Sequence, residues 1–434
     1  MKLNVAKRPV FTHEGGRAKN VNVEKQLRRS VFSCLLWERE FYEDGVTIAD
    51  RISELAKAAP AAVVCDLVRE ARNEFHLRHV PLLLVCALAE AGGRGAAVEE
   101  GIAHAIQRAD EITELVAIWW RNGRRPLTAA MKRGLAAAFN RFSEYQFAKY
   151  DRDGAVRLRD VMFLVHAKPA TEEQAGVFKR IAERQLVTPD TWEVALSAGA
   201  DKAGTFTRLL REGKLGYLAL LRNLRNMMEA GVNSVMVRDA IVARKGADRV
   251  LPFRYVAAAR ACPMLEPEID VALKDAVSAL PRLPGRTICL VDISGSMDSP
   301  LSRKSDLTRL DAAATLASIL NCETLRVFSF TDGICEVPPH RGMAGIDVVV
   351  KSQPHGGTYL GGAVKYLNDN VPHDRLIVIT DEQTADRVPD PVCEHAYMVN
   401  VASAKNGVGY GRWTHIDGFS ENVIRFIVES ESCL

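Results

Sequence analysis

Apolar side chains recur at every third or fourth position over the first two thirds of the chain, which is the period of an α-helix. From Glu24 to about Leu280 this pattern predicts consecutive helices. Clear examples are the segments 27–44, 48–59, 80–91 and 99–123. Short breaks join them, and short connections favour antiparallel neighbours. No strict sequence period is present, so the pattern predicts an irregular, HEAT-like solenoid of helix pairs.

The pattern changes at the segment PRLPGR, residues 281–286, where two prolines and a glycine end the helical periodicity. Predicted strands and helices alternate after it. The strands are expected at 287–294, 324–332, 345–352, 375–382 and 395–403, and the helices at 307–321, 360–370 and 421–430. Such alternation indicates an open, mostly parallel sheet covered by helices, an α/β domain.

The sequence therefore predicts a multi-domain chain in three parts. Residues 1–23 form an N-terminal segment, residues 24–284 form an all-α helical-repeat module, and residues 285–434 form the α/β domain. A chain of 434 residues is too long for one ordinary core, which agrees with this division.

Charge is unevenly distributed between these parts. Residues 285–434 contain 13 Lys and Arg against 19 Asp and Glu, a net charge of −6. Residues 1–284 contain 44 against 35, a net charge of +9. A basic surface of this kind attracts phosphates and nucleic acid. On charge alone, a solvated helical surface rich in Arg is the favoured interpretation.

The chain shows no sign of a membrane or secreted protein. No apolar run reaches the roughly 18 residues that a membrane-spanning helix needs, and the first 17 residues lack the apolar core of a signal peptide. The nine cysteines are scattered and form no CxxC pair, which favours reduced thiols over disulfides or a zinc site. We expect a cytoplasmic protein.

Polar side chains end the strand predicted at 287–294. Asp292, Ser294 and Ser296 follow at every second position, and two later loops supply Thr358 and Asp381. Ligands of such sheets bind at the carboxyl ends of the strands, so these oxygens are expected to converge. Two carboxylates and three hydroxyls are hard ligands, suited to Mg²⁺ or Mn²⁺.

Other interpretations of these segments are weaker. The DxSxS spacing alone could be a strand-end turn. The glycine-rich loop at 355–362 lacks the Gly-Lys-Ser/Thr ending of a phosphate loop, and SGSM is not a GxSxG nucleophile elbow. No acid/base or nucleophile constellation is evident, so the sequence predicts a protein that is not an enzyme.

The arrangement resembles the metal-ion-dependent adhesion site of von Willebrand factor A domains. The five residues match that motif one by one: Asp292, Ser294, Ser296, Thr358 and Asp381. Because the hydroxyls are neutral, they leave the ion only partly neutralised. An outside carboxylate or phosphate can then complete its coordination shell.

Two segments of the helical part carry a second resemblance. The stretches LALLRNLRNM at 218–227 and AKYDRDGAVRLRDVMFLVHAKP at 148–169 resemble TROVE-module proteins, the Ro autoantigen family of RNA-binding proteins. The segments 27–45 and 249–259 are similar in character to bacterial members. A helical solenoid followed by an A domain is also the order found in that family.

The resemblance implies a ring in which the A domain closes the solenoid. It implies a non-catalytic scaffold for RNA quality control, binding single-stranded 3′ ends of misfolded RNA in the ring and small noncoding Y-like RNA on a basic outer surface. A monomeric ring is expected, and an exoribonuclease is a further candidate partner. The alternative is a protein-interaction scaffold that uses the Mg-dependent adhesion site.

The same resemblance points to RNA-binding side chains in the segment 148–169. Lys149, His166 and Lys168 match family positions, and Arg152 and Arg157 extend the basic strip. Each has a structural alternative, because arginines on a helix are often only solvated and a single His can be a buried hydrogen-bonding residue. Phosphate contacts and stacking are what such a strip would supply to RNA.

Overall fold

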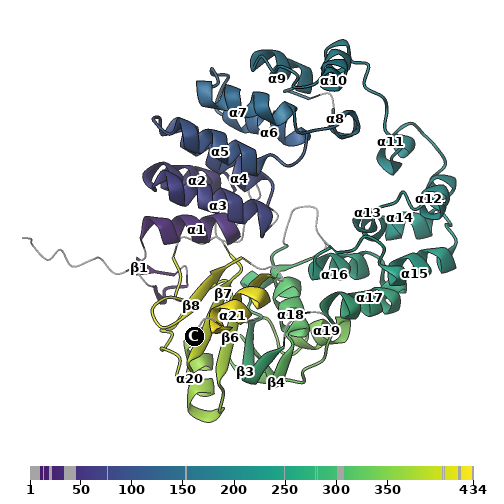
Figure 1. Cartoon of the computed structure of the whole chain (residues 1–434). Coiled ribbons are helices and arrows are strands. Elements are labelled where there is room, and N and C mark those ends of the chain that lie inside the picture. Colours follow the sequence, from purple (N-terminus) through teal and green to yellow (C-terminus); the bar gives the residue numbers. More distant parts are fainter. Residues whose placement is uncertain are drawn as a thin grey trace, which may run out of the picture. The chain divides into compact units, whose positions relative to one another are not determined.

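The computed structural model of the chain shows helices and a sheet (Figure 1). It describes residues 10–12, 14–18, 22–33, 45–75, 77–151, 154–248, 250–278, 280, 282–300, 307–402, 404, 406–418 and 422–432. These fall into two compact units. The helical unit comprises 22–32 and 45–194, and the sheet unit comprises 1–21, 33–44 and 195–434. We describe each unit by itself.

The helical unit is built from stacked antiparallel helices, as the apolar periodicity predicts. In chain order these are α1 (Val23–Ser33), α2 (Gly45–Ala58), α3 (Ala61–Asn73), α4 (His79–Glu90), α5 (Gly95–Ala105), α6 (Asp110–Trp119), α7 (Ala129–Phe139), α8 (Glu144–Tyr150), α9 (Leu158–Leu164) and α10 (Glu172–Glu183). Helix α4 is buried along almost its whole length, against α2, α3, α5 and α6. Its sequence, HVPLLLVCALAE, is accordingly apolar all round.

The single helix expected at 99–123 is wrong, because the chain breaks between α5 and α6. Ile106 adopts an extended conformation after α5. The backbone N–H groups of Gln107 and Arg108 then donate to Glu111 Oε2 at 2.7 and 2.9 Å. The other oxygen of this fully buried carboxylate accepts from Arg72 Nη2 at 2.6 Å. Glu111 thus holds the turn before α6 from within the core.

The sheet unit contains a six-stranded sheet with the order β5-β4-β3-β6-β7-β8. Its strands are β3 (Leu283–Asp292), β4 (Cys322–Phe330), β5 (Ile334–Val337), β6 (Arg375–Thr380), β7 (His395–Asn400) and β8 (Thr414–Asp417). All neighbours are parallel except β4 and β5. The helices around it are α18 (Arg309–Ile319), α19 (Met343–Val350), α20 (Leu360–Asn370) and α21 (Asn422–Ser432), with a short 3₁₀ turn, η2 (Gly295–Asp298), after β3.

Helices cover both faces of this sheet. Leu360, Val364 and Leu367 of α20 pack on one face, against alternate residues of β3, β4, β6 and β7. On the opposite face Glu431 of α21 accepts from Arg375 Nε at 2.6 Å and from the Tyr397 hydroxyl at 2.9 Å. The predicted fold class, helical repeats followed by an α/β domain, is confirmed.

Two details of the α/β domain differ from the expectation. The strand expected at 345–352 is wrong, because these residues belong to helix α19, which buries Ile346 and Val349 against α18. The run of Ile and Val favours a strand locally, and tertiary packing overrides that preference. The strands β5 and β8 were not predicted; each has only four residues.

Further helices pack with the sheet rather than with the first helices. They are α12 (Lys202–Arg211), α13 (Tyr217–Arg222), α14 (Leu224–Glu229), α15 (Ser234–Ala243), α16 (Pro252–Ala261), the 3₁₀ turn η1 (Pro263–Leu265) and α17 (Glu266–Ser278); α11 (Trp192–Ser197) spans the division. Arg260 of α16 pairs with Asp311 of α18 and Asp347 of α19 at 3.3 and 2.6 Å. The change of element type near residue 284 therefore lies inside a compact unit, and the predicted domain limits stay a prediction.

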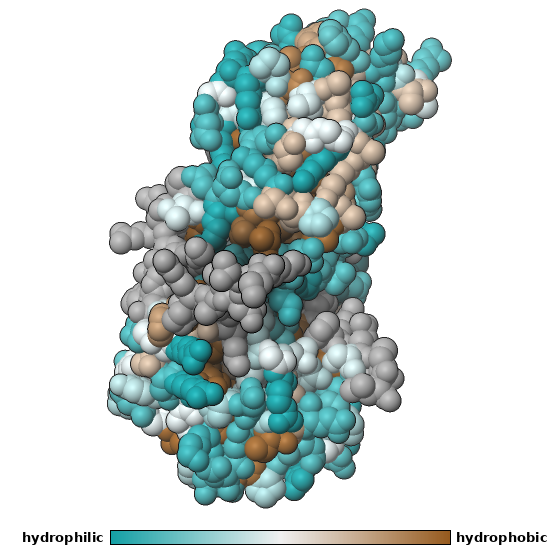
Figure 2. Space-filling model, turned by 90° about the vertical axis from the view of Figure 1, so that its left-hand side faces the viewer, coloured by the Kyte–Doolittle hydropathy of each residue, from teal (hydrophilic) through white to brown (hydrophobic). Residues whose placement is uncertain are grey.

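The surface of the molecule is largely polar. The face shown in Figure 2 is mostly hydrophilic, with apolar residues in small groups. Among the described residues, no helix combines the length and the apolar character that crossing a membrane requires. Scattered apolar side chains of this kind are normal on protein surfaces.

A two-stranded hairpin near the N-terminus belongs to the sheet unit. Strand β1 (Val10–Phe11) pairs with β2 (Arg17–Ala18), and the hairpin binds the loop after β6. Thr12 Oγ1 donates to the Thr384 carbonyl at 2.7 Å, and the Gly16 amide donates to the same oxygen at 3.2 Å. The segments are 372 positions apart in the sequence, and this contact joins the hairpin to the sheet.

The hairpin should depend on glycine at position 16. A Cβ added there would lie 2.3 Å from the Thr384 carbonyl oxygen, so Gly16→Ala must lift the hairpin. A clash of this size costs about 1–3 kcal/mol, and we expect amide hydrogen exchange over residues 10–18 to accelerate about ten-fold. The control is Gly333→Ala, where an added Cβ meets nothing within 4 Å. Unchanged exchange in Gly16→Ala would show that the hairpin is not held at this point.

Candidate functional site

Parallel strand pairing brings three loops together at one edge of the sheet. Asp292 ends β3 and Asp381 follows β6, and these strands are paired with Val291 opposite Ile379. The Gly295 amide donates to the Gly356 carbonyl at 3.1 Å, which joins the loop after β3 to the loop before α20. The convergence expected from the sequence is therefore present at the level of the backbone.

The five predicted metal ligands are all buried at this edge. Asp292 Oδ1 accepts from the Ser294 amide at 2.9 Å, and its Oδ2 accepts from Thr380 Oγ1 at 2.6 Å. The Ser294 and Ser296 hydroxyl oxygens lie 3.2 Å apart. These contacts hold the DxSxS segment in a compact turn.

Thr358 is positioned by the loop after β6. Its carbonyl accepts from the Ala385 amide at 2.9 Å and from Thr384 Oγ1 at 3.0 Å. The next residue, Tyr359, donates its amide to the Thr331 carbonyl at the end of β4, at 3.0 Å. The loop that carries Thr358 is therefore fixed by both neighbouring strand ends.

The environment of Asp292 destabilises the charge of its carboxylate. Burial and the nearby Asp381 carboxylate raise the pKa of Asp292 to about 7. Asp381 Oδ1 accepts from the Gln383 amide at 3.0 Å, whereas its buried Oδ2 has no hydrogen-bond partner. A buried charged oxygen without a partner is costly, and a cation beside it would remove both penalties.

The residues present fit a hard divalent cation. Among the described residues, no group of three or more His, Cys, Asp or Glu side chains is placed to hold a metal ion, so an ion here would depend on hydroxyl oxygens as well. Two carboxylates and three hydroxyls form such an all-oxygen set. The assignment of the five residues as ligands stays a prediction.

A second buried polar cluster lies beside this edge and was not predicted. Glu382, fully buried and in a left-handed conformation with φ of 59°, accepts from the amides of Val408 and Gly409 at 2.6 and 2.7 Å. His415 Nε2 lies 2.5 Å from Glu382 Oε1, and its Nδ1 lies 3.4 Å from Asp417 Oδ2. Of these residues, only Glu382 lies next to a candidate ligand that the sequence indicates, Asp381.

The predicted RNA-binding residues lie in and around α8 and α9 of the helical unit. Lys149 is on α8, Arg157 precedes α9, and His166 and Lys168 follow α9. His166 is exposed with φ of 52°, so the alternative of a buried His is wrong. Asn140 Nδ2 donates to the Lys168 carbonyl at 2.9 Å, which fixes this turn while the Lys168 side chain is exposed. Arg152 lies outside the described residues.

Part of the chain is similar to known proteins. Residues 178–269 match the TROVE domain. Telomerase protein component 1 of Mus musculus is 27% identical over 220 residues, which are 47% of this chain and 8% of that protein. Its counterpart from Rattus norvegicus is 31% identical over 90 residues, 20% of this chain and 3% of that protein. The similarity to the TROVE domain therefore covers about a fifth of the chain.

A solved Ro protein shares the fold. The crystal structure of the Deinococcus radiodurans Ro (Rsr) protein matches with a TM-score of 0.64 and 18% identity, over 94% of this chain and all of that chain. In contrast, this chain spans less than a tenth of the two telomerase components. The TROVE match covers the segment from α10 to α17 and includes 218–227, one of the two stretches on which the resemblance was based.

The buried His415 predicts a pH-dependent stability. Burial opposes its protonation, but Asp417 and Glu382 outweigh this and raise its pKa to about 9. A raised folded-state pKa gives stability that is fully present below the unfolded pKa of about 6.5 and is lost as the pH rises towards 9. We expect the free energy of unfolding of wild type to exceed that of His415→Gln by on the order of 3 kcal/mol near pH 6. Above pH 9 the difference should be much smaller.

Urea unfolding at both pH values, in the presence of a chelator, measures this difference. His340→Gln, at an exposed position of the same unit, is the matched control. A difference between wild type and His415→Gln that does not change with pH would mean that the imidazole is not held as a cation in this cluster.

Proposed function

We propose that this protein is a non-catalytic RNA-binding scaffold of the Ro type that acts in RNA quality control. It binds small structured noncoding RNA on a basic outer surface of the helical unit and single-stranded 3′ ends of misfolded RNA in a channel. The observation that carries this proposal is the TROVE domain at residues 178–269, because proteins of the Ro/TROVE family bind RNA.

The chemistry of the α8–α9 segment supports an RNA surface there. One short stretch contains Lys149, Arg157, His166 and Lys168. Arg159, in the first turn of α9, is exposed. The Arg159 guanidinium lies 5.8 Å from the ring of the exposed Phe163. Cationic groups contact phosphates and exposed rings stack on unpaired bases, which are the two interactions that single-stranded and looped RNA requires.

The ring implied by the resemblance needs the helical unit to be joined to the sheet unit on both sides. The helical unit comprises residues 22–32 and 45–194, and the sheet unit includes residues before and after them in the sequence. The segment on the N-terminal side is also anchored by hydrogen bonds, because the hairpin at 10–18 binds Thr384 and Asn406 Nδ2 donates to the Phe11 carbonyl at 2.9 Å.

Within this proposal the sheet unit holds one Mg²⁺ or Mn²⁺ in a site of the von Willebrand A type. The ligands would be Asp292, Ser294, Ser296, Thr358 and Asp381. The ion would supply a partly neutralised cation to which an outside carboxylate or phosphate oxygen can bind. The unpartnered Asp381 Oδ2 and the raised pKa of Asp292 support this assignment.

The candidate metal site also favours a second function. A protein-interaction scaffold could capture an acidic side chain through the ion, with helices that bind protein only. The two hypotheses differ in the absorbance of the purified protein. An RNA scaffold prepared at low salt should carry nucleic acid and absorb strongly at 260 nm relative to 280 nm, whereas a protein scaffold should not.

RNA binding should depend on the basic strip and on salt. We expect the double reversal Lys149→Glu and Lys168→Glu to weaken binding of a structured RNA by at least about ten-fold, and wild-type affinity to fall by a similar factor between about 50 and 200 mM salt. Fluorescence anisotropy with a labelled hairpin RNA measures both. The control is Lys351→Glu with Lys365→Glu, an equal charge change on the sheet unit. RNA binding that is unchanged in the double reversal and independent of salt concentration would favour the protein-scaffold hypothesis.

Metal binding should depend on Asp381. Removing this carboxylate in Asp381→Ala also relieves the repulsion on Asp292, so we expect no loss of stability in a chelator but complete loss of Mg²⁺ or Mn²⁺ binding by calorimetry. Wild type should gain about 2.7 kcal/mol of unfolding free energy at a metal concentration of 100 Kd. Asp390→Asn, at an exposed position, should behave as wild type. Unchanged metal affinity in Asp381→Ala would contradict the assignment.

A further inference from the structure

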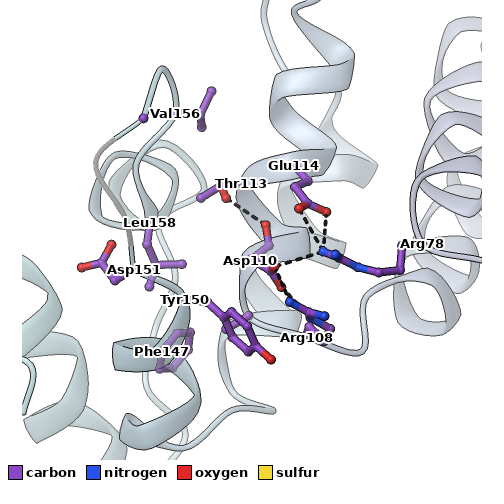
Figure 3. A pocket seen from close by; sticks show the side chains of 12 residues that line it. Arg78, Arg108, Asp110, Thr113, Glu114, Phe147, Tyr150, Asp151, Val156 and Leu158 are labelled. Carbon is purple, nitrogen blue, oxygen red and sulfur yellow. Dashed lines mark hydrogen bonds and ion pairs between the residues drawn. The ribbon is translucent and has the colours of Figure 1, made fainter. Parts of the chain in front are cut away.

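The helical unit contains a polar pocket that neither the sequence nor the family comparison assigned (Figure 3). One side is formed by the start of α6 and by Arg78, which precedes α4. The other side is formed by α8 and by Asp151, Gly154, Val156 and Leu158. The volume of the pocket is about 320 Å³, near the lower limit of small-molecule sites. A pocket of this size can take one planar group such as a nucleobase.

Ion pairs fix the charged wall of this pocket. Arg78 Nη2 binds Asp110 Oδ2 at 3.0 Å and the two Glu114 oxygens at 3.0 and 3.1 Å. Arg108 binds Asp110 through two N–H groups, at 3.0 and 2.8 Å. Side chains held this way are in place before a ligand arrives, so a ligand would lose little entropy in ordering them.

An aromatic ring adjoins this wall. Tyr150 of α8 lines the pocket, and the Arg108 guanidinium carbon lies 4.3 Å from the centre of its ring. Lys149 Nζ lies 5.6 Å from the same ring. Unpaired bases stack on aromatic rings and on guanidinium planes, and both surfaces are present here.

The wall offers acceptors and donors together. Burial alone would raise the pKa of Glu114, but His79, Arg78 and Arg108 outweigh it and lower that pKa, so Glu114 stays an acceptor. A carboxylate has about four lone-pair sites, and the bonds to Arg78 leave further acceptor capacity. Guanine presents adjacent N1–H and N2–H₂ donors beside its O6 and N7 acceptors, which suits a carboxylate next to an arginine. Uracil has no amino group to offer.

A second pocket adjoins the first and shares Asp151 with it. Its volume is about 370 Å³, and three arginines line it: Arg157, Arg159 and Arg184. Three guanidinium groups against one carboxylate make a site of net positive charge. Guanidinium groups are suited to two-point contacts with phosphate oxygens.

We propose that the two pockets together bind one unpaired guanosine nucleotide of an RNA. The base stacks on the outer side of the Tyr150–Arg108 pair with its Watson–Crick edge towards Glu114, and the flanking phosphate lies among Arg157, Arg159 and Arg184. This inference rests on the proposed RNA-binding function and adds to it a base preference, because phosphate contacts alone carry no sequence information.

The test uses the full chain and short single-stranded oligouridines that carry one central guanosine, inosine or adenosine, or none, at one salt concentration. By anisotropy we expect the guanosine RNA to bind about ten-fold more tightly than oligouridine. Inosine lacks the 2-amino group and should be intermediate. In Tyr150→Leu and in Glu114→Gln the guanosine preference should fall to about two-fold or less, whereas Arg184→Gln should weaken all four RNAs alike.

Two matched variants control for changes that do not touch the pocket. Tyr145→Leu removes a ring that is 52% exposed on the same helix, α8, and Glu172→Gln neutralises an exposed acid on α10. Both should keep the wild-type preference for guanosine. Thermal unfolding of every variant shows whether Tyr150→Leu is folded, and Glu114→Gln keeps the side-chain shape if it is not.

The outcomes separate this inference from the proposed function. Equal wild-type affinity for the guanosine RNA and oligouridine would overturn the pocket assignment while leaving RNA binding in place. A guanosine preference that persists in both Tyr150→Leu and Glu114→Gln would also overturn it. Failure of wild type to bind any of the four RNAs or a structured RNA would instead contradict the proposed function itself.

Discussion

The parallel pairing of β3 with β6 is the constraint on which the organisation of the sheet unit depends. It places Asp292 and Asp381 at the same edge of the sheet, where burial and the neighbouring carboxylate raise the pKa of Asp292 to about 7. The loop after β6 also supplies the carbonyl of Thr384, to which the N-terminal hairpin binds. One register of strand pairing thus organises both the candidate metal site and the attachment of the N-terminal segment.

The two units separate two kinds of chemistry. The sheet unit buries four carboxylates near the carboxyl edge of the sheet: Asp292, Asp381, Glu382 and Asp417. In the helical unit the α8–α9 segment presents cationic and aromatic groups at the surface and in two adjoining pockets. Short helices and their connections leave side chains free of core packing, so this segment can carry recognition while α2 to α7 supply the stable frame.

Several of these features could be predicted from the sequence, since they follow from local pattern. Helical periodicity located α2 and α4 to within a few residues, and the DxSxS spacing after a buried strand located the sheet edge at Asp292. The features that were missed depend on contacts between distant residues. Helix α19 is β-branched in sequence but is set by packing on α18, and the break before α6 is set by Glu111, whose position in the core no local pattern shows. Likewise, Glu382 and His415 are 33 positions apart, and Arg108 and Tyr150 meet only in the folded unit.

Ultraviolet crosslinking of the full chain to bound RNA, followed by mass spectrometry of the crosslinked peptides, tests the central claim most directly. It reports which residues touch RNA without altering any of them. We expect crosslinks at Tyr150 or Phe163 and in the peptides that span residues 147–168 of the helical unit. Crosslinks confined to the sheet unit, or none in RNA-saturated protein, would contradict an RNA-binding surface at α8 and α9.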